Sequence, residues 1–135
     1  MKPYLLALLC SLSLTTSLSA YYEEAKSQIK DLRTDAQWRS VLIGYDAYYA
    51  VGLYDAYRYS LLVINMWERK YEPKKAPRFK IKDSLLTLMA ISTEQADQGY
   101  FTVEESWSGQ GFRQGLKKSI SILEGKPFLD ENIFH

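Results

Sequence analysis

The sequence predicts an all-α protein, a small bundle of four to five helices with one long central helix. From residue 38 to residue 67, apolar side chains recur every three or four positions, which is the spacing of one helical face. Two later stretches, beginning near residues 83 and 112, repeat this spacing. The strict alternation that is typical of strands is almost absent. Packing helices against one another is the simplest way to bury such stripes.

The long helix is predicted to begin at a capping box. Thr34-Asp35-Ala36-Gln37 places a hydroxyl and an amide three residues apart, so each can bond an unpaired backbone N–H. We therefore expect one helix, or two in line, from Asp35 to about Tyr71, preceded by a polar helical segment at 22–33. Gly44 and Gly52 within it are expected to be close-packing points or a hinge.

The next stretch, residues 72–82, is predicted to be a loop with a short extended piece. It contains two prolines, and Phe79 and Ile81 alternate with lysines. Asp83 or Ser84 is then expected to cap a helix. Gly99 is placed to end that helix.

A second capping box, Thr102-Val103-Glu104-Glu105, predicts another helix start. Ser108-Gly109-Gln110-Gly111 is expected to be a break or a loop, after which Phe112 to Leu123 is helical. Gly125 and Pro127 should stop this helix. The apolar residues of 126–135 are expected to pack back onto the body.

The first twenty residues have the features of a secretory signal peptide. Lys2 is followed by a charge-free run from Tyr4 to Leu18, and small residues follow at Ser19 and Ala20. Cys10 follows Leu9 inside the apolar run, which does not suit lipid attachment. We expect residues 1–20 to be cleaved and residues 21–135 to form a single helical domain, periplasmic or secreted.

The charge balance, the cysteine count and the length of the apolar runs exclude several classes of protein. Lys2 is the only charge among the first twenty residues, so the rest of the chain carries 16 basic and 16 acidic side chains. This balance is unlike that of nucleic-acid binders. The chain has one cysteine, so it cannot form an internal disulfide. No later run approaches the length of a membrane span, so we expect no stable span.

The tyrosines are the most unusual feature of the composition. Six of the eleven lie between residues 45 and 59, and Tyr-Asp-Ala-Tyr occurs at 45–48 and again at 54–57. Nine residues rotate a helix by about 900°, so the two copies should face opposite sides. One set can line the core while the other meets solvent or a partner. We name Tyr48, Tyr54 and Tyr57 as candidate partner contacts. The alternative is that the tyrosines of this helix are large residues at the edge of the core.

Asp46 and Asp55 lie inside this apolar helix. Nine residues place them on opposite sides and about 13 Å apart along the axis, so one metal or acid–base site cannot use both. Asp55 is instead expected to pair with Arg58 or Arg39.

The segment Tyr49-Ala50-Val51-Gly52-Leu53-Tyr54-Asp55-Ala56 resembles the Tyr-x-x-Gly-x-x-Asp-Ala helix of the Rap1a/Tai-type immunity proteins. Those small helical periplasmic proteins neutralise amidase effectors of type VI secretion. Family members usually carry cysteines around this motif, whereas this chain has none after Cys10. The resemblance implies that the chain binds and blocks a toxin without catalysis, with Tyr49, Gly52 and Asp55 as motif residues.

Two further segments are candidate contacts. Basic residues crowd the stretch from 69 to 82, whereas residues 83–112 hold five acids and no lysine or arginine. Lys74, Lys75 and Arg78 could bind an acidic partner surface or anionic lipid headgroups. The alternative is that they belong to a solvated loop that is balanced by an acidic face. Trp107 and Phe112 flank the glycines of the predicted loop and form a plausible contact site.

Catalytic and metal motifs are scarce. The single histidine is His135, the last residue, so the usual Ser–His, Cys–His and histidine–zinc arrangements cannot form. We expect no metal, no cofactor and no enzymatic activity. A carboxylate-based enzyme that uses Glu104 or Glu105 beside Trp107 is the least favoured of three hypotheses.

The two favoured hypotheses both describe binding. The first is an exported inhibitor or immunity protein that blocks a toxin or effector. The second is an envelope accessory or assembly subunit of a larger complex. In either case the partner is a protein, and a homodimer is possible; nucleic acid is not expected.

Overall fold

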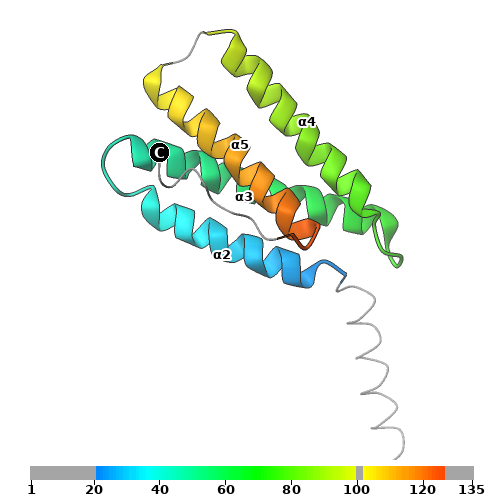
Figure 1. The fold of residues 1–135 in the computed structure, drawn as a ribbon. Helices are drawn as coiled ribbons and strands as arrows, with labels where there is room; N and C mark the ends of the chain where they lie inside the picture. Colours follow the sequence, from blue (N-terminus) through cyan, green and yellow to red (C-terminus); the bar gives the residue numbers. More distant parts are fainter. Residues whose placement is uncertain (1–20, 100–101, 127–135) are drawn as a thin grey trace, which may run out of the picture.

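Helix α3 (Tyr45–Tyr71) is the longest element of the fold, with 27 residues. The computed structural model describes residues 21–99 and 102–126, and these form four helices (Figure 1). The others are α2 (Glu23–Arg39), α4 (Arg78–Asp97) and α5 (Val103–Leu123). The predicted all-α bundle with a long central helix is therefore confirmed.

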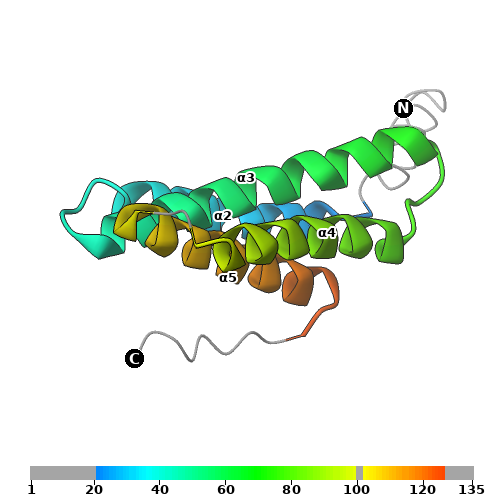
Figure 2. The same ribbon diagram turned by 90° about the horizontal axis from the view of Figure 1, so that it is seen from above.

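Successive helices run antiparallel, so α3 and α5 run parallel to each other (Figure 1). These two form the most extensive contact, and α2 and α4 each pack against both of them (Figure 2). Within the described residues α2 and α4 do not touch. The α3–α5 pair is thus the centre of the bundle, with one helix on each flank.

The contact between α3 and α5 is made by small residues spaced four apart. Gly52, Ala56 and Ser60 lie on α3, and Gly111, Gly115 and Ser119 lie on α5; all are buried. Rows of this spacing form the ridges and grooves through which helices interlock. A Cβ atom at Gly52 would lie 1.9 Å from the Ser108 carbonyl oxygen. Gly52 is therefore a close-packing point, one of the two roles that the sequence left open for it.

The predicted helix start at Thr34 is wrong. Helix α2 continues to Arg39, and the Thr34 hydroxyl donates to the Lys30 carbonyl inside the helix, at 3.1 Å. The chain reverses over residues 40–44, where Gly44 has a φ of +100°. That left-handed conformation favours glycine, so Gly44 belongs to a turn and not to a helix interior. Residues 35–71 consequently form parts of two antiparallel helices.

Helix α4 begins six or seven residues earlier than the predicted cap at Asp83 or Ser84 implies. Pro77 is its N-cap residue, in extended conformation, and Ile81 lies inside the helix and is fully buried. Ile81 and Leu85 are four apart, so both turn toward the core. Ser84 is not a cap: its hydroxyl donates to the Lys80 carbonyl and accepts the Trp67 indole N–H at 2.9 Å. The end at Gly99, with a φ of +72°, is confirmed.

Helix α5 is continuous through Ser108-Gly109-Gln110-Gly111, so the predicted break there is wrong. The glycines are tolerated because Gly111 is used for close packing against α3. The predicted cap is confirmed, since the Thr102 hydroxyl accepts the Glu105 N–H at 3.2 Å. The predicted stop is confirmed at Gly125, which has a φ of +69°.

One core joins all four helices, and its fully buried large side chains are Ile29, Ile64, Ile81, Leu85 and Leu116. None of the described helices is long and apolar enough to cross a bilayer. The proposed signal peptide (1–20) and the C-terminal segment 127–135 lie outside the described residues.

Candidate interaction surface

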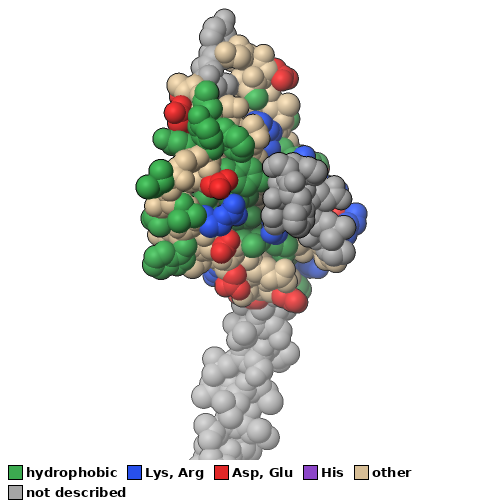
Figure 3. Space-filling model, turned by 60° about the vertical axis from the view of Figure 1, so that its left-hand side comes forward, with side chains coloured by type: hydrophobic (Ala, Val, Ile, Leu, Met, Phe, Trp, Pro, Cys, Tyr) green, Lys and Arg blue, Asp and Glu red, His purple; other side chains and the backbone are tan. Residues whose placement is uncertain are grey.

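Large apolar side chains are exposed at the α2–α3 turn. Trp38 and Val41 are each 72% exposed, Leu42 is 58% exposed and Ile43 is 99% exposed. We call residues 38–43 the apolar turn. Figure 3 brings this end of the bundle forward and shows hydrophobic side chains grouped on it. Fully hydrated aliphatic side chains cost free energy, so this cluster is not explained by folding alone.

The first turns of α3 and α5 extend this apolar surface. The Tyr45 ring stacks on the Trp107 ring, with 5.5 Å between centroids and 11° between planes. Tyr48, Val51 and Val103 are also exposed. The stack fixes the start of α5 against α3 and places Trp107 beside the apolar turn.

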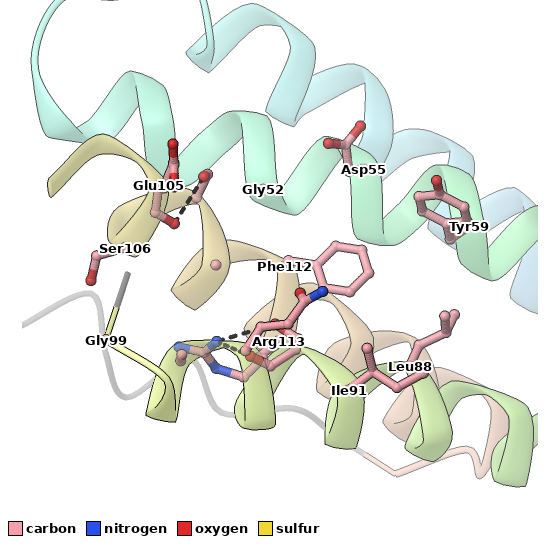
Figure 4. A pocket seen from close by; sticks show the side chains of 15 residues that line it. Gly52, Asp55, Tyr59, Leu88, Ile91, Gly99, Glu105, Ser106, Phe112 and Arg113 are labelled. Atoms are coloured by element: carbon pink, nitrogen blue, oxygen red, sulfur yellow. Dashed lines mark hydrogen bonds between the residues drawn. The ribbon is translucent and has the colours of Figure 1, made fainter. Parts of the chain in front are cut away.

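A groove of about 640 Å³ lies beyond this stack, between α3, α4 and α5 (Figure 4). Its apolar walls come from all three helices: Tyr59, Leu88, Ile91 and Phe112. The Tyr59 and Phe112 rings meet edge to face, with centroids 6.0 Å apart. The groove exists because α4 buries Ile81 and Leu85 near its start, while Ile91 further along is 48% exposed.

The polar groups of the groove belong to few side chains. The Arg113 guanidinium donates to the Ser92 carbonyl at 3.3 Å and to its hydroxyl at 3.1 Å, which ties α5 to α4 (Figure 4). Asp55 lines the α3 wall and pairs with Arg58 at 3.6 Å, as the sequence predicts. Glu105 lines the end of the groove nearest the α5 N-terminus.

The tyrosine candidates have different environments. Tyr48 is 42% exposed and Tyr54 is half-buried, but Tyr57 is 2% exposed and belongs to the core. The choice of Tyr57 as a partner contact is therefore wrong, because its ring cannot be reached from solvent. The two Tyr-Asp-Ala-Tyr repeats are predicted to face opposite sides of the helix. Their last tyrosines do so, because Tyr48 is exposed and Tyr57 is buried.

The other candidates are distributed over both ends of the bundle. Trp107 and Phe112 are half-buried side chains of a helix, not of a loop. Lys74, Lys75 and Arg78 are exposed around the α3–α4 connection, at the opposite end from the apolar turn (Figure 1). The Lys75 ammonium lies 5.9 Å and 5.5 Å from the ring centroids of Tyr21 and Tyr22.

Two of the three motif residues, Gly52 and Asp55, line the groove. Gly52 is buried against α5, Asp55 lines the groove, and Tyr49 is half-buried, with its carbonyl turned toward Gly111. In this structure the glycine of the motif thus serves helix packing, and the aspartate faces the groove.

Sequence reasoning missed the apolar turn and the groove. Val41 and Leu42 fit the helical apolar spacing of residues 38–67, which predicts that they lie on the apolar face of the long helix. The run Val-Leu-Ile before Gly44 is the signal that could have marked a turn. Nothing in the sequence around Tyr59, Leu88 and Ile91 indicates that they line one groove, because this depends on how α4 packs against α3 and α5.

No protein-family model, curated protein or solved structure matches the chain. Across residues 21–99 and 102–126, no three histidine, cysteine or acidic side chains gather in a way that could hold a metal ion.

Proposed function

We propose that this chain is a binding protein that contacts a protein partner through the apolar turn and the adjoining Tyr45–Trp107 stack. The observation that carries the proposal is Val41-Leu42-Ile43, three consecutive aliphatic side chains exposed at one end of a well-packed bundle. Contiguous exposed apolar surface of this kind marks interaction sites in folded proteins. Trp and Tyr beside it are the side chains that contribute most to interface energies.

We further propose that the protein is exported and acts as an immunity or inhibitor protein that blocks a toxin or effector. The first twenty residues support export, and the resemblance of Tyr49–Ala56 to the immunity helix supports inhibition. Export is tested by fractionation and N-terminal sequencing of the processed chain. Recovery of an unprocessed chain from the cytoplasm contradicts it.

An envelope accessory subunit is the alternative, because it would present the same apolar surface to a larger assembly. The two functions differ in the partner, a toxin in one case and an envelope component in the other. Identification of the captured partner therefore separates them.

A catalytic role is less well supported. Asp55 and Glu105 line the same groove, and two carboxylates are what a glycoside hydrolase requires. However, the Asp55 side chain is 41% exposed and pairs with Arg58, and Glu105 is exposed in the first turn of α5. A general acid normally needs a shielded carboxyl group. We therefore propose binding and not hydrolysis.

Site-specific photo-crosslinking in the producing cell tests the binding proposal. A crosslinking residue at Ile43 should give a discrete adduct with one protein, whereas the same residue at Thr87, exposed on α4, should not. Leu42→Ser with Ile43→Ser should abolish the adduct formed from a crosslinker at Val41 and leave the melting temperature unchanged. Adduct formation that is indifferent to the position of the crosslinker contradicts the proposal.

A further inference from the structure

We propose that the groove between α3, α4 and α5 is a receptor site for a cationic amphipathic helix of the partner. The proposal rests on an apolar groove whose lining comes mostly from residues 83–112, a stretch with five acidic side chains and no lysine or arginine. This inference rests on the proposed binding function and supplies the chemistry of the partner.

The shape of the groove suits a helix. Its α3 wall is formed by Gly52, Asp55 and Tyr59, and its α4 wall includes Leu88, Ile91 and Gln95. Both sets are spaced three or four apart, so they form rows along the helix axes. The helical part of the α4 wall extends from Leu88 to Ala96, about 12 Å or just over two turns. A third helix lying between two such rows is the usual helix-in-groove arrangement.

The apolar side chains that line the groove differ in how deeply they are buried. Phe112 rises from α5 and meets Tyr59 edge to face, and Leu88 is half-buried beside the core. Ile91 is 48% exposed at the rim. A volume of about 640 Å³ accommodates several large side chains from one face of a helix.

Most of the groove lining comes from the stretch 83–112, which holds five acidic side chains and no lysine or arginine. Asp55 and Glu105 line the groove, whereas Glu94, Asp97 and Glu104 are exposed elsewhere on α4 and α5 and do not line it. Arg113 also lines the groove and keeps its charge while it donates two hydrogen bonds to Ser92, and Arg58 pairs with Asp55. The negative field at the groove therefore comes from Glu105 and from the other acids of the stretch 83–112. Lysines and arginines flanking the apolar face of a partner helix would therefore be attracted.

The groove and the proposed interface use neighbouring residues of α5. Ser106 and Ser108 line the groove, and Trp107 between them stacks on Tyr45 beside the apolar turn. One partner can thus contact the apolar turn and place a helix in the groove. The acidic side chains of the stretch 83–112 disfavour an anionic lipid surface as the occupant.

Two designed peptides test this inference. Both have roughly 18 residues, long enough to form a helix on binding, with leucine at helical spacing; one has Lys and the other Glu at the polar positions. Titration calorimetry with the purified chain should show 1:1 binding of the lysine peptide, at least about tenfold tighter than the glutamate peptide. A lysine peptide of the same composition with scrambled leucine positions should not bind.

Matched variants locate the site. Ile91→Ser should weaken binding at least about fivefold, because Ile91 lines the groove, whereas Leu86→Ser on the exposed face of the same helix should not. Glu105→Lys should weaken the lysine peptide and strengthen the glutamate peptide. Neither Ile91 nor Glu105 is buried, so both variants should fold, which thermal unfolding checks.

Three results overturn the inference: equal affinity for both peptides, binding that is unaffected by Ile91→Ser, and preferential binding of phosphatidylglycerol vesicles. A concentration-dependent dimer that Ile91→Ser dissociates also overturns it, because the occupant is then a second copy. If the peptides fail while the Ile43 crosslink persists, the groove inference is wrong and the binding function stands. Loss of the crosslink contradicts both.

Discussion

The Gly111 Cα atom of α5 lies directly against the Tyr49 carbonyl group of α3. A Cβ atom added at Gly111 would lie 2.0 Å from that carbonyl oxygen and 3.2 Å from the Leu53 backbone nitrogen. Both obstacles are backbone atoms of a long helix, which cannot move aside as a side chain can. The α3–α5 contact at the centre of the bundle therefore requires glycine at this position.

Gly111→Ala should lower the free energy of unfolding by about 3 kcal/mol, because the added methyl group forces α3 and α5 apart. Gly109→Ala, in the same helix, is the matched control. Its Cβ would meet only the Arg113 Nη1 atom, at 3.3 Å, so it should stabilise by up to about 1 kcal/mol through helix propensity. Urea unfolding measures both, and equal effects would refute the close-packing explanation.

The N-terminal cap of α5 should also contribute measurably. Thr102→Ala removes the acceptor for the Glu105 N–H and should cost about 1 kcal/mol. Thr93→Ala is the control, because the Thr93 hydroxyl only donates back to the Met89 carbonyl inside α4. Its effect should stay within about 0.5 kcal/mol. A similar loss in both variants would mean that capping is not the cause.

Lys26 links α2 to α3. Its ammonium lies 2.7 Å from a Glu68 carboxylate oxygen, and the two side chains are only 12% and 15% exposed. Burial opposes the charged form of Lys26, but hydrogen bonds to Glu68 and Glu23 outweigh it and raise the pKa.

Lys26→Met should therefore cost roughly 1–2 kcal/mol, since it leaves the Glu68 carboxylate without its cation in a shielded position. Glu23→Gln should cost at most about 0.5 kcal/mol, because the Glu23 side chain is 55% exposed. The double variant Lys26→Met with Glu68→Leu should recover much of the loss, and chemical unfolding of all three variants checks this. No recovery would show that the ion pair is not responsible.

Glu124 should make stability depend on acid pH. Hydrogen bonds from Lys82 and Lys126 lower its pKa below the ordinary glutamate value. A lowered pKa gives stabilisation that is complete above the ordinary value, about 4.3, and is lost as the pH falls through the folded-state pKa.

Glu124→Gln should thus be less stable than the original chain at pH 6, and the difference should shrink as the pH approaches 3. One molar salt should also reduce the difference at pH 6, because both lysines are partly solvent-exposed. Urea midpoints at several pH values measure this. A difference that does not vary with pH would show that the ionised carboxylate is not the stabilising group.

The features that the sequence predicted correctly depend on local contacts. The apolar spacing along α3 defines a helical face, Thr102 caps the helix that it precedes, and Gly99 and Gly125 follow helix ends because their φ angles are positive. Each of these depends on residues within about one helical turn. The all-α class and most helix ends could therefore be predicted without knowledge of the packing.

Other features required the tertiary structure, because the same residue type serves different purposes in different surroundings. Gly44 makes a turn while Gly52 and Gly111 admit a neighbouring helix, and nothing in their own segments separates the two uses. The predicted break at 108–111 and the predicted start at Thr34 were wrong for this reason. Likewise, only the docking of α4 decides that Tyr59 and Ile91 share a groove.

By itself, then, the sequence determined that this protein is helical, where its amphipathic stripes run and which residues can stop them, since these follow from backbone chemistry and short-range spacing. Only the tertiary structure decided that the glycines of α5 serve packing, that Tyr57 is core and that Val41, Leu42 and Ile43 are exposed. Those outcomes depend on which helices pack against each other, and this is determined by how the chain as a whole buries its apolar surface.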